Sequence, residues 1–519
     1  MCGIAWVIAL EEFIEKMGKD DSGGVPISVA YETFRILRWN ENRWGQGYGM
    51  TFLWDNWYWK TDKFLDISSA EVREKIAAIK GRAYAWMWHA RYATSSVTSN
   101  DDLEKNLPFV SDEVIEFDEN RIFCFTFNGN IANSKKIKER LQLKWKEKWI
   151  DRKFKYENYD SEVLKFMIVD LLESWISDLR IIVEEINKEI DGCCNVAILL
   201  KESGRFIASV DTHEFRPLFW GVKEGLFYYS SEEHALESRW VDSIKKLSAW
   251  EFIEVIDWRI YPWNMRLPID PTPCPLEYIY FSNGRSLLHN NESIQRWRTR
   301  LWRTMAELEN LPIEENPEAF VIVWVPDGWN PYAQGYAEFF WKKPLQAILK
   351  DQDIWKTFTA SEEDRHIKLI KKYLSAFEWK AQWKKLILLD DSLVRSSTLR
   401  RLIPYIKERL KPKEIHIRIC SPTINGHCPY ALNIQSIEEL FAPKYVKDPY
   451  NVQLEENVKM SEALGVASIR FLPLWHLHEE MVRVKVENAC LACMSWSYPT
   501  PCWQREHDRQ KAIFDEVHK

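Results

Sequence analysis

The sequence predicts a protein of at least two units that mix helices and strands. In the segment from Leu386 to Leu410, an apolar run leads into Asp390 and Asp391, then into a hydroxyl-rich turn and a helical pattern. Such a segment is typical of a buried parallel strand whose carboxyl end opens into a helix, the usual place for a phosphate ligand in an open α/β sheet. A chain of 519 residues is long enough for two or more domains. Its apolar and charged fractions, 46% and 28%, are ordinary for a globular protein.

Charge and hydropathy argue against nucleic-acid and membrane partners. The net charge of −7 and the pI near 6.0 give no attraction toward nucleic acid or an anionic membrane. No apolar run approaches the roughly 18 residues that a membrane span needs, and no basic segment followed by an apolar core opens the sequence. We therefore expect a cytoplasmic protein. In a reducing compartment its ten cysteines indicate catalysis or metal binding rather than a disulfide framework.

The N-terminus places a cysteine directly after the initiator methionine. If Met1 is removed, Cys2 carries both a thiol and a free α-amino group. An α-amine titrates near pH 7.7–8.0, so it can act as general base for the thiol of its own residue. Taken alone, Cys2 would favour the alternative, a small buried residue on a first strand.

Three further motifs give Cys2 a chemical context. Arg91 supplies a guanidinium that can hold a carboxylate by a two-pronged contact. Asn128 and Gly129 end an apolar strand with an amide side chain and a backbone N–H, the parts of an oxyanion hole. Asp160 is an acid suited to a substrate ammonium. Together these residues indicate hydrolysis of the side-chain amide of a free amino acid.

In this order the motifs resemble the class II glutamine amidotransferase domain, an N-terminal-nucleophile hydrolase. The resemblance covers roughly residues 2–235 and also matches Gly45-Gln46 and the segments 211–218 and 230–232. It implies Cys2 as nucleophile, Arg91 and Asp160 as the residues that hold glutamine, and Asn128 with Gly129 as oxyanion hole. The later segments are similar to those of one subfamily, the amidophosphoribosyltransferases of purine synthesis.

The second half contains a loop that resembles the phosphoribosyl-pyrophosphate (PRPP) loop of type I phosphoribosyltransferases. Two carboxylates at a strand end suit a ribose diol or a magnesium-bound pyrophosphate, and the turn suits a monophosphate. The resemblance implies Mg²⁺ at Asp390 and Asp391 and PRPP held by those two acids and the residues that follow, namely Ser392, Arg395, Ser396, Ser397 and Thr398. From this loop alone, a strand followed by a solvated Asp-Asp turn explains the pattern as well.

Four cysteines match the positions that hold a [4Fe–4S] cluster in the iron–sulfur branch of the amidophosphoribosyltransferases. They are Cys274, Cys428, Cys490 and Cys493. Four thiolates suit such a cluster, and structural zinc is the less favoured occupant. Buried free thiols are the alternative, and they are the expectation for the other internal cysteines, such as Cys124 and Cys420.

The resemblance spans roughly residues 2–500 and implies a fold of class α+β and α/β. A four-layer αββα glutaminase domain, residues 2–255, precedes an α/β phosphoribosyltransferase domain with a mostly parallel sheet, residues 256–480, and a tail, 481–519, that carries the C-x-x-C pair. The implied partners are glutamine, PRPP, inhibitory purine nucleotides and further copies of the chain in a homotetramer. Two alternatives remain: another class II amidotransferase, which feeds ammonia to a sugar phosphate, and a catalytically impaired paralogue that acts as a regulatory or scaffold subunit.

The chain departs from the family pattern in two ways. Tryptophan occurs 27 times and glycine only 18 times, whereas glycine alone normally makes up about 7% of a chain. Tryptophan stands where the family has glycine at several points, namely Trp6, Trp88, Trp250, Trp302, Trp324, Trp329, Trp379, Trp383 and Trp496. We hypothesise that many of these residues are glycine in the living protein, through a UGA codon read as glycine. Genuine tryptophans in a drifting pseudoenzyme are the alternative.

The second kind of departure lies around the PRPP loop. Ser396 replaces a family glycine, Gly328 replaces a family serine near the magnesium, and residues 350–357 are less basic than the family's closing loop. These changes predict weaker PRPP binding or a changed acceptor.

Overall fold

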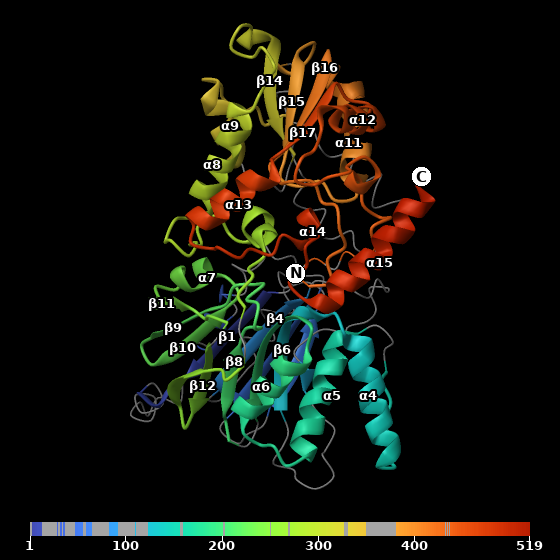
Figure 1. Cartoon of the computed structure of the whole chain (residues 1–519). Coiled ribbons are helices and arrows are strands. Elements are labelled where there is room, and N and C mark those ends of the chain that lie inside the picture. Colours follow the sequence, from blue (N-terminus) through green and yellow to red (C-terminus); the bar gives the residue numbers. More distant parts are fainter. Residues whose placement is uncertain are drawn as a thin grey trace. The chain divides into compact units, whose positions relative to one another are not determined.

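A computed structural model describes most of the chain. The described residues are 3–12, 29, 32–33, 35–36, 47–54, 59–64, 83–91, 109–110, 123–155, 159–200, 203–249, 251–267, 270–325, 331–348, 380–430, 432, 434 and 436–518. Contacts divide the chain into two compact units (Figure 1). The first comprises residues 1–273 with the short segment 429–433, and the second comprises residues 274–428 and 434–519.

The first unit contains two antiparallel sheets. The seven-stranded sheet has the strand order β11-β9-β10-β1-β4-β2-β3. Its strands are β1 (Gly3–Ala9), β2 (Gly47–Trp54), β3 (Trp59–Phe64), β4 (Ala83–Arg91), β9 (Phe219–Lys223), β10 (Leu226–Ser230) and β11 (Asp242–Lys246). The six-stranded sheet has the order β13-β12-β8-β7-β6-β5. Its strands are β5 (Phe109–Val110), β6 (Phe123–Ile131), β7 (Gly192–Leu200), β8 (Phe206–Ser209), β12 (Glu251–Ile256) and β13 (Arg259–Asn264).

The two sheets pack face to face, and helices cover the other face of the six-stranded sheet. Every residue of β7 is buried, as expected for a strand covered on both sides. Ala197 and Leu199 of β7 face Ile4 and Trp6 of β1 in one core. The intervening β7 residues pack against α4 (Ser134–Glu147), α5 (Asp160–Glu173) and α6 (Leu179–Glu189) in a second core. These layers confirm the predicted sandwich of sheets with a helical cover. The short α7 (Glu233–Glu237) follows β10.

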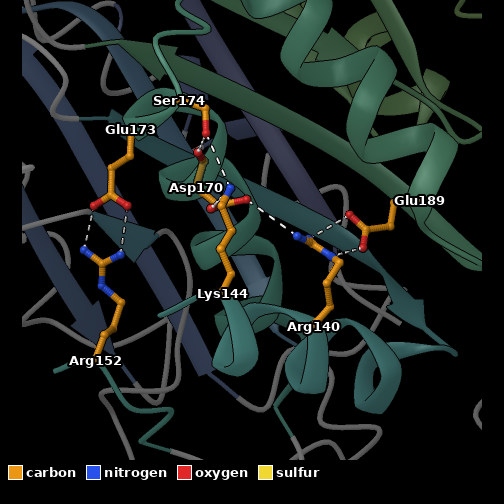
Figure 2. Close-up of polar contacts among 7 residues, drawn as sticks. All are labelled: Arg140, Lys144, Arg152, Asp170, Glu173, Ser174 and Glu189. Atoms are coloured by element: carbon orange, nitrogen blue, oxygen red, sulfur yellow. Dashed lines mark hydrogen bonds and ion pairs between the residues drawn. The ribbon is translucent and has the colours of Figure 1, made fainter. Parts of the chain in front are cut away.

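Ion pairs tie α4 to its two helical neighbours, as Figure 2 shows. Asp170 of α5 lies 2.5 Å from Lys144 Nζ and 3.6 Å from Arg140 Nη1. Arg140 also forms a two-pronged contact, at 2.6 and 2.9 Å, with the carboxylate of Glu189 at the end of α6. Charge pairs of this kind fix the register of neighbouring helices more than they stabilise them, because they remain partly exposed.

The second unit is built on a parallel sheet, which confirms the predicted α/β class. Its order is β14-β15-β16-β17, and every pair is parallel. The strands are β14 (Phe320–Trp324), β15 (Lys385–Asp390), β16 (Glu414–Ile419) and β17 (Ser468–Phe471), joined by α9 (Pro331–Phe339), α11 (Ser397–Leu410) and α12 (Leu454–Leu464). Figure 1 shows α11 and α12 beside this sheet. Leu399, Ile403 and Ile406 of α11 face the strands, at the spacing of an apolar helical stripe.

Helices complete the second unit at both ends of its sequence. A short π-helical turn (Glu277–Phe281) and α8 (Ile294–Glu307) precede the sheet, and α13 (Leu474–Arg483), α14 (Ala492–Ser495) and α15 (Pro501–Val517) follow it. Among the described residues, no helix combines the length and the apolar character needed to cross a membrane.

The division between the units differs from the predicted boundary near residue 255. It falls between Pro273 and Cys274. The reason is that β13 pairs along its length with β12, which in turn pairs with β8, so the hairpin belongs to the six-stranded sheet. The residues from 481 onward belong to the second unit rather than to a separate tail.

Candidate active sites

The oxyanion-hole candidates lie in the last part of β6. Asn128 pairs with Asn195 of β7, and Gly129 pairs with Cys194. A Cβ added to Gly129 would lie 1.8 Å from the carbonyl oxygen of Cys193. Only glycine fits this close approach of two backbones, so the glycine that the motif predicted has a structural reason as well as a chemical one.

Asp160, the candidate ligand for a substrate ammonium, is held against the same strand. It is the first residue of α5, and its Oδ2 accepts a hydrogen bond of 3.2 Å from the backbone N–H of Ile131. Burial raises the pKa of the Asp160 carboxyl, while the backbone N–H groups of Ile131 and Ser161 act in the opposite direction. A substrate ammonium beside this carboxylate would favour its ionised form.

Arg216 also converges on this strand, although the sequence motifs gave it no role. It is 1% exposed, and its Nη1 donates a hydrogen bond to Oδ1 of Asn128. A guanidinium has only donors, so this contact requires the amide oxygen of Asn128 on that side. The Nδ2 group is then directed elsewhere, and it lies 3.5 Å from Oγ of Ser231.

A turn that is stabilised by Asp211 places Arg216 beside Asn128. The Asp211 carboxylate accepts hydrogen bonds from the backbone N–H groups of His213, at 3.1 Å, and Phe215, at 3.3 Å. It also accepts one from Cys194 of β7, at 3.3 Å. The sequence indicated the segment 211–218 only through its resemblance to the family. The pairing of Arg216 with Asn128 could not be predicted, because 88 residues separate the two.

Cys2 and the side chain of Arg91 lie outside the described residues, as do Gly45 and Gln46. The backbone nonetheless places their neighbours. Gly3, which follows Cys2, pairs with Ala90, which precedes Arg91. The backbone N–H of Ile4 donates to Oγ of Ser231 at 3.2 Å. The Ser231 hydroxyl therefore links the start of β1 to Asn128, and strand pairing places the end of β4 beside the start of β1.

The second candidate site is formed where β15 ends. Asp390 is the last residue of the strand, and its Oδ1 accepts a hydrogen bond of 3.0 Å from the backbone N–H of Asp391. Oγ of Ser392 donates to Oδ1 of Asp391 at 3.0 Å. Burial, and then the charge of Asp391, raise the pKa of Asp390 well above the usual range for a carboxyl. A divalent cation here would relieve the repulsion between the two carboxylates, so the pair fits the predicted magnesium site.

The rest of the predicted PRPP loop follows directly. Arg395 lies 2.7 Å from Glu439. Ser396 precedes α11 with a left-handed backbone, φ +59°, and its Oγ accepts a hydrogen bond of 2.9 Å from Nε of Arg400. Ser397 and Thr398 begin α11, so their N–H groups belong to the first turn of a helix, where a phosphate is favoured. Gly328 and residues 350–357 lie outside the described residues.

The four matched cysteines gather within the second unit. Cys274, Cys428 and Cys493 are buried. The backbone N–H of Gly426, two residues before Cys428, donates to the carbonyl of Cys493 at 2.9 Å. Burial raises the pKa of the Cys493 thiol well above its usual range, and the charges of Cys428, Cys274 and Cys490 raise it further.

The donor set of four thiols from three segments fits an iron–sulfur or zinc site. Within the ranges that the structure describes, however, no three His, Cys, Asp or Glu side chains are grouped closely enough to form a metal site. The thiols are thus near one another but are not arranged in the geometry of a metal site.

Comparisons with known proteins agree with this arrangement. A glutamine amidotransferase domain model matches residues 109–238. The amidophosphoribosyltransferase of Methanocaldococcus jannaschii is 26% identical over 433 residues, which cover 80% of this chain and 83% of the relative. That of Bacillus subtilis is 24% identical and covers 83% of each chain.

Two solved structures share the fold. The glutamine PRPP amidotransferase of Bacillus subtilis in complex with ADP and GMP aligns with a TM-score of 0.76 at 22% identity, over 97% of this chain and 98% of that one. A structure described as the allosteric regulatory enzyme of purine biosynthesis aligns with a TM-score of 0.78, also at 22% identity, over 97% of each. The resemblance predicted from the motifs is confirmed, and it extends through both units.

Proposed function

We propose that this chain is an amidophosphoribosyltransferase, which takes ammonia from glutamine and transfers it to PRPP. The products are 5-phosphoribosylamine, glutamate and pyrophosphate, in the first step of purine biosynthesis. One observation carries the proposal: a single chain contains two candidate sites, one in each unit. The candidate residues for amide hydrolysis lie around β6 in the unit with two antiparallel sheets, and the Asp-Asp strand end lies at β15 in the unit with the parallel sheet. The relatives matched along most of their length support it.

At the first site, Cys2 is the nucleophile. Its thiolate attacks the side-chain carbonyl carbon of glutamine, and the negative charge that develops on the oxygen is stabilised by Nδ2 of Asn128 and the N–H of Gly129. The intermediate collapses to a thioester as ammonia leaves with the proton taken up by the α-amine. Water then hydrolyses the thioester and releases glutamate. Arg91 holds the carboxylate of the substrate, and Asp160 holds its ammonium.

At the second site, ammonia attacks C1 of the ribose and pyrophosphate leaves. Asp390 and Asp391 would hold Mg²⁺, which neutralises charge on the leaving group. The N–H groups and hydroxyls of Ser396, Ser397 and Thr398 bind the 5-phosphate. Since ammonia is mostly protonated at neutral pH and then not nucleophilic, internal transfer between the sites keeps it reactive.

The four cysteines would hold a [4Fe–4S] cluster, with zinc as the less favoured occupant. Cys274, Cys428 and the Cys490–Cys493 pair come from three distant segments, so a cluster would cross-link the second unit rather than take part in the reaction. Inhibition by purine nucleotides, a homotetramer and a cytoplasmic location complete the proposal. The ADP and GMP in the Bacillus subtilis structure support the nucleotide part.

The test is an assay of protein purified from its native cells. Glutamate and pyrophosphate should appear in equal amounts, and both should depend on PRPP and Mg²⁺. Replacement of Cys2 by alanine should abolish the reaction with glutamine but not the reaction with added ammonia, because only the first site uses the thiol. Glutamine hydrolysis that ignores PRPP but responds to a sugar phosphate would identify another class II amidotransferase. Absence of both half-reactions would indicate an impaired paralogue.

A further inference from the structure

Tryptophan occupies an unusual share of the left-handed backbone positions. Among the described residues, fifteen non-glycine residues have a positive φ, and seven of them are tryptophan. These seven are Trp149, Trp175, Trp240, Trp258, Trp341, Trp383 and Trp496, with φ between 55° and 66°. Tryptophan makes up 27 of 519 residues, so about one would be expected among fifteen. The left-handed region is disfavoured for any residue with a Cβ, and glycine is its usual occupant.

Four of the seven end a helix with the same hydrogen-bond pattern. After α4, the N–H of Trp149 donates to the carbonyl of Lys146 at 3.2 Å, and the N–H of Ile150 donates to the carbonyl of Trp145 at 2.9 Å. These are the two bonds of the Schellman motif, in which the left-handed residue is usually glycine. The same pair of bonds is made by Trp175 and Ile176 after α5, by Trp240 and Val241 after α7, and by Trp341 and Lys342 after α9.

The same chain shows this motif with glycine in the left-handed position. After α12, Gly465 has φ +67°. Its N–H donates to the carbonyl of Glu462, and the N–H of Val466 donates to the carbonyl of Ser461, both at 3.0 Å. Lys485 after α13 shows that another residue is tolerated, since it has φ +65° and makes the corresponding bond to Val482 at 2.9 Å. One exception is ordinary, whereas four tryptophans at four equivalent helix ends are not.

Two hairpins give a second matched comparison. The β9–β10 hairpin turns through Glu224 and Gly225, with φ +52° and +77°. The β12–β13 hairpin turns through Asp257 and Trp258, with φ +47° and +61°. Two-residue hairpin turns with both φ values positive are of type I′, and Asp-Gly is among their preferred sequences. Trp258 thus stands at the position that Gly225 occupies in the other hairpin.

The side chains at the four helix ends give no compensating burial. The exposed fractions are 95% for Trp149, 76% for Trp175, 81% for Trp240 and 98% for Trp341. A ligand surface rich in tryptophan would not explain the pattern, because binding through an indole does not require a left-handed backbone. Trp496 does use its ring, since Nε1 donates to the carbonyl of Asn425 at 3.0 Å. At that position the backbone alone favours glycine.

The structure changes the set of tryptophans that the sequence comparison singled out. Of those described, Trp383 and Trp496 are left-handed. Trp6 is not: it is fully buried in β1, and its indole donates to Oγ1 of Thr126 at 2.9 Å. Trp302 packs edge-on against Tyr336. Trp324 ends β14, and Trp88 lies within β4, so both have an extended backbone. The backbone gives no reason for glycine at these four positions. Trp250, Trp329 and Trp379 lie outside the described residues, and so does the side chain of Trp88.

We propose that residues 149, 175, 240, 258, 341, 383 and 496 are glycine in the protein that the organism makes. The corresponding codons would be UGA, written here as tryptophan but read as glycine in the cell. Reading these seven positions as glycine would move both counts, 18 glycines and 27 tryptophans, toward ordinary values. This inference does not depend on the proposed function, because it rests on backbone conformation.

Peptide mass spectrometry of the protein from its native cells is the direct test. We expect the mass of glycine at positions 149, 175, 240 and 341, and UGA at the seven codons of the gene. Tryptophan at those four positions, or UGG codons there, would overturn the proposal. The peptide masses and the codon sequence are both independent of whether the purified protein has activity.

A recombinant comparison tests the physical argument separately. In the chain as written, the double variant Trp175→Gly/Trp341→Gly should unfold at a higher temperature than the parent, because both positions are left-handed. The matched control is Trp145→Gly/Trp297→Gly, at two buried tryptophans inside α4 and α8. The control should unfold at a lower temperature, since it loses buried ring area and adds glycine within a helix. A lower unfolding temperature for the first variant would contradict the proposal.

Discussion

Arg216 determines which end of the Asn128 amide faces the first site. Its Nη1 meets Oδ1 of Asn128, and its charge also acts on the carboxyl of Asp160. An amide that rotated by half a turn would present an acceptor to the developing oxyanion and would destabilise it. Under the proposed mechanism, Arg216 is a positioning residue: it would orient the Asn128 donor without itself contacting the substrate.

We expect Arg216→Met to lower kcat for glutamine by roughly 10²-fold, the loss typical when one oxyanion donor is removed. Arg216→Lys should recover part of this loss, because a lysine keeps the positive charge but lacks the planar fork. The measurement is kcat and KM with glutamine for both variants. A merely structural role would lower the ammonia-dependent reaction equally, so an unchanged rate with ammonia is the required control.

Ser396 gives a second residue-scale prediction. Its left-handed backbone costs about 1–2 kcal/mol relative to glycine, while its hydroxyl contributes a hydrogen bond with Arg400, worth about 0.5–1.5 kcal/mol. Because the two terms nearly cancel, Ser396→Gly should change the free energy of unfolding by less than about 1 kcal/mol. Its KM for PRPP should fall, because the backbone can approach the phosphate more closely.

The neighbouring residue supplies the matched control. Ser397 begins α11 with a helical backbone, so Ser397→Gly should destabilise the protein by up to about 1 kcal/mol without lowering the KM for PRPP. Equal effects of the two substitutions would show that the backbone of Ser396 does not limit binding.

At the scale of elements, a buried ion pair joins the end of α8 to the parallel sheet. Glu309, just beyond α8, contacts Arg418 of β16 through bonds of 2.5 and 2.9 Å. Both side chains are 1% exposed, and Tyr336 of α9 donates its hydroxyl to the same carboxylate. Although burial opposes ionisation, the hydrogen bond and charge of Arg418 lower the pKa of Glu309 to about 2.

Glu309→Gln should destabilise the second unit by about 3–5 kcal/mol, because it leaves the Arg418 charge buried without compensation. Since the pKa is lower in the folded than in the unfolded state, the pair contributes stability above the unfolded value near 4.5. That stability is lost as the pH falls toward 2. Denaturant unfolding at pH 7 and pH 3 measures both effects. Glu307→Gln is the control: its contact with Arg303 is long, at 3.5 Å, and half-exposed, so it should change stability by less than about 1 kcal/mol.

Elements were more predictable from the sequence than the contacts between them. The β15 strand, its Asp-Asp end and α11 follow from an apolar run, two acids and a helical stripe, all of which are local patterns. The placement of Arg216 beside Asn128 and of Glu309 beside Arg418 depends on segments about a hundred residues apart, and no local pattern encodes it. The division of the chain into units likewise depends on distant contacts, since the pairing of β12 with β8 assigns the β12–β13 hairpin to the first unit.

For the molecule as a whole, the chain itself connects the two units at several points. It passes from the first unit to the second at Pro273–Cys274, and the segment 429–433 returns to the first unit directly after Cys428. Within the first unit, Asn130 of β6 donates a hydrogen bond of 2.5 Å to the carbonyl of Pro429, and the ring of Tyr430 stacks on Phe215 at 4.6 Å. The candidate cluster ligand Cys428 is thus one peptide bond away from a segment that is bound to β6, the strand of the oxyanion-hole candidates.

The separation of the two chemistries leads to the last prediction, which concerns Asp390→Asn. With Asp390 as the proposed ligand of Mg²⁺, its loss would remove several kcal/mol of transition-state stabilisation, so formation of 5-phosphoribosylamine should fall by roughly 10²–10³-fold. The basal hydrolysis of glutamine that is measured without PRPP and Mg²⁺ uses residues of the other unit, so this rate should equal that of the parent. Equal loss of both activities would show that the sites are not chemically separate.

The same variant should be more stable than the parent at neutral pH in the absence of Mg²⁺. Burial and the charge of Asp391 raise the pKa of Asp390 in the folded state. A carboxyl with a raised pKa stabilises the fold at acid pH, and this contribution is lost as the pH rises through the folded-state pKa. The parent should therefore lose stability as the pH rises from the usual range of a carboxyl toward the raised pKa of Asp390, whereas Asp390→Asn should lose less. Mg²⁺ with PRPP should restore the stability of the parent and leave that of the variant unchanged, because a ligand stabilises only the state that binds it.

Thermal unfolding at pH 5 and at pH 8, with and without Mg²⁺ and PRPP, measures all of these effects. The difference in stability between the parent and the variant should therefore differ between pH 5 and pH 8. If it is the same at both values, the surroundings of Asp390 do not disfavour the ionised form of its carboxyl.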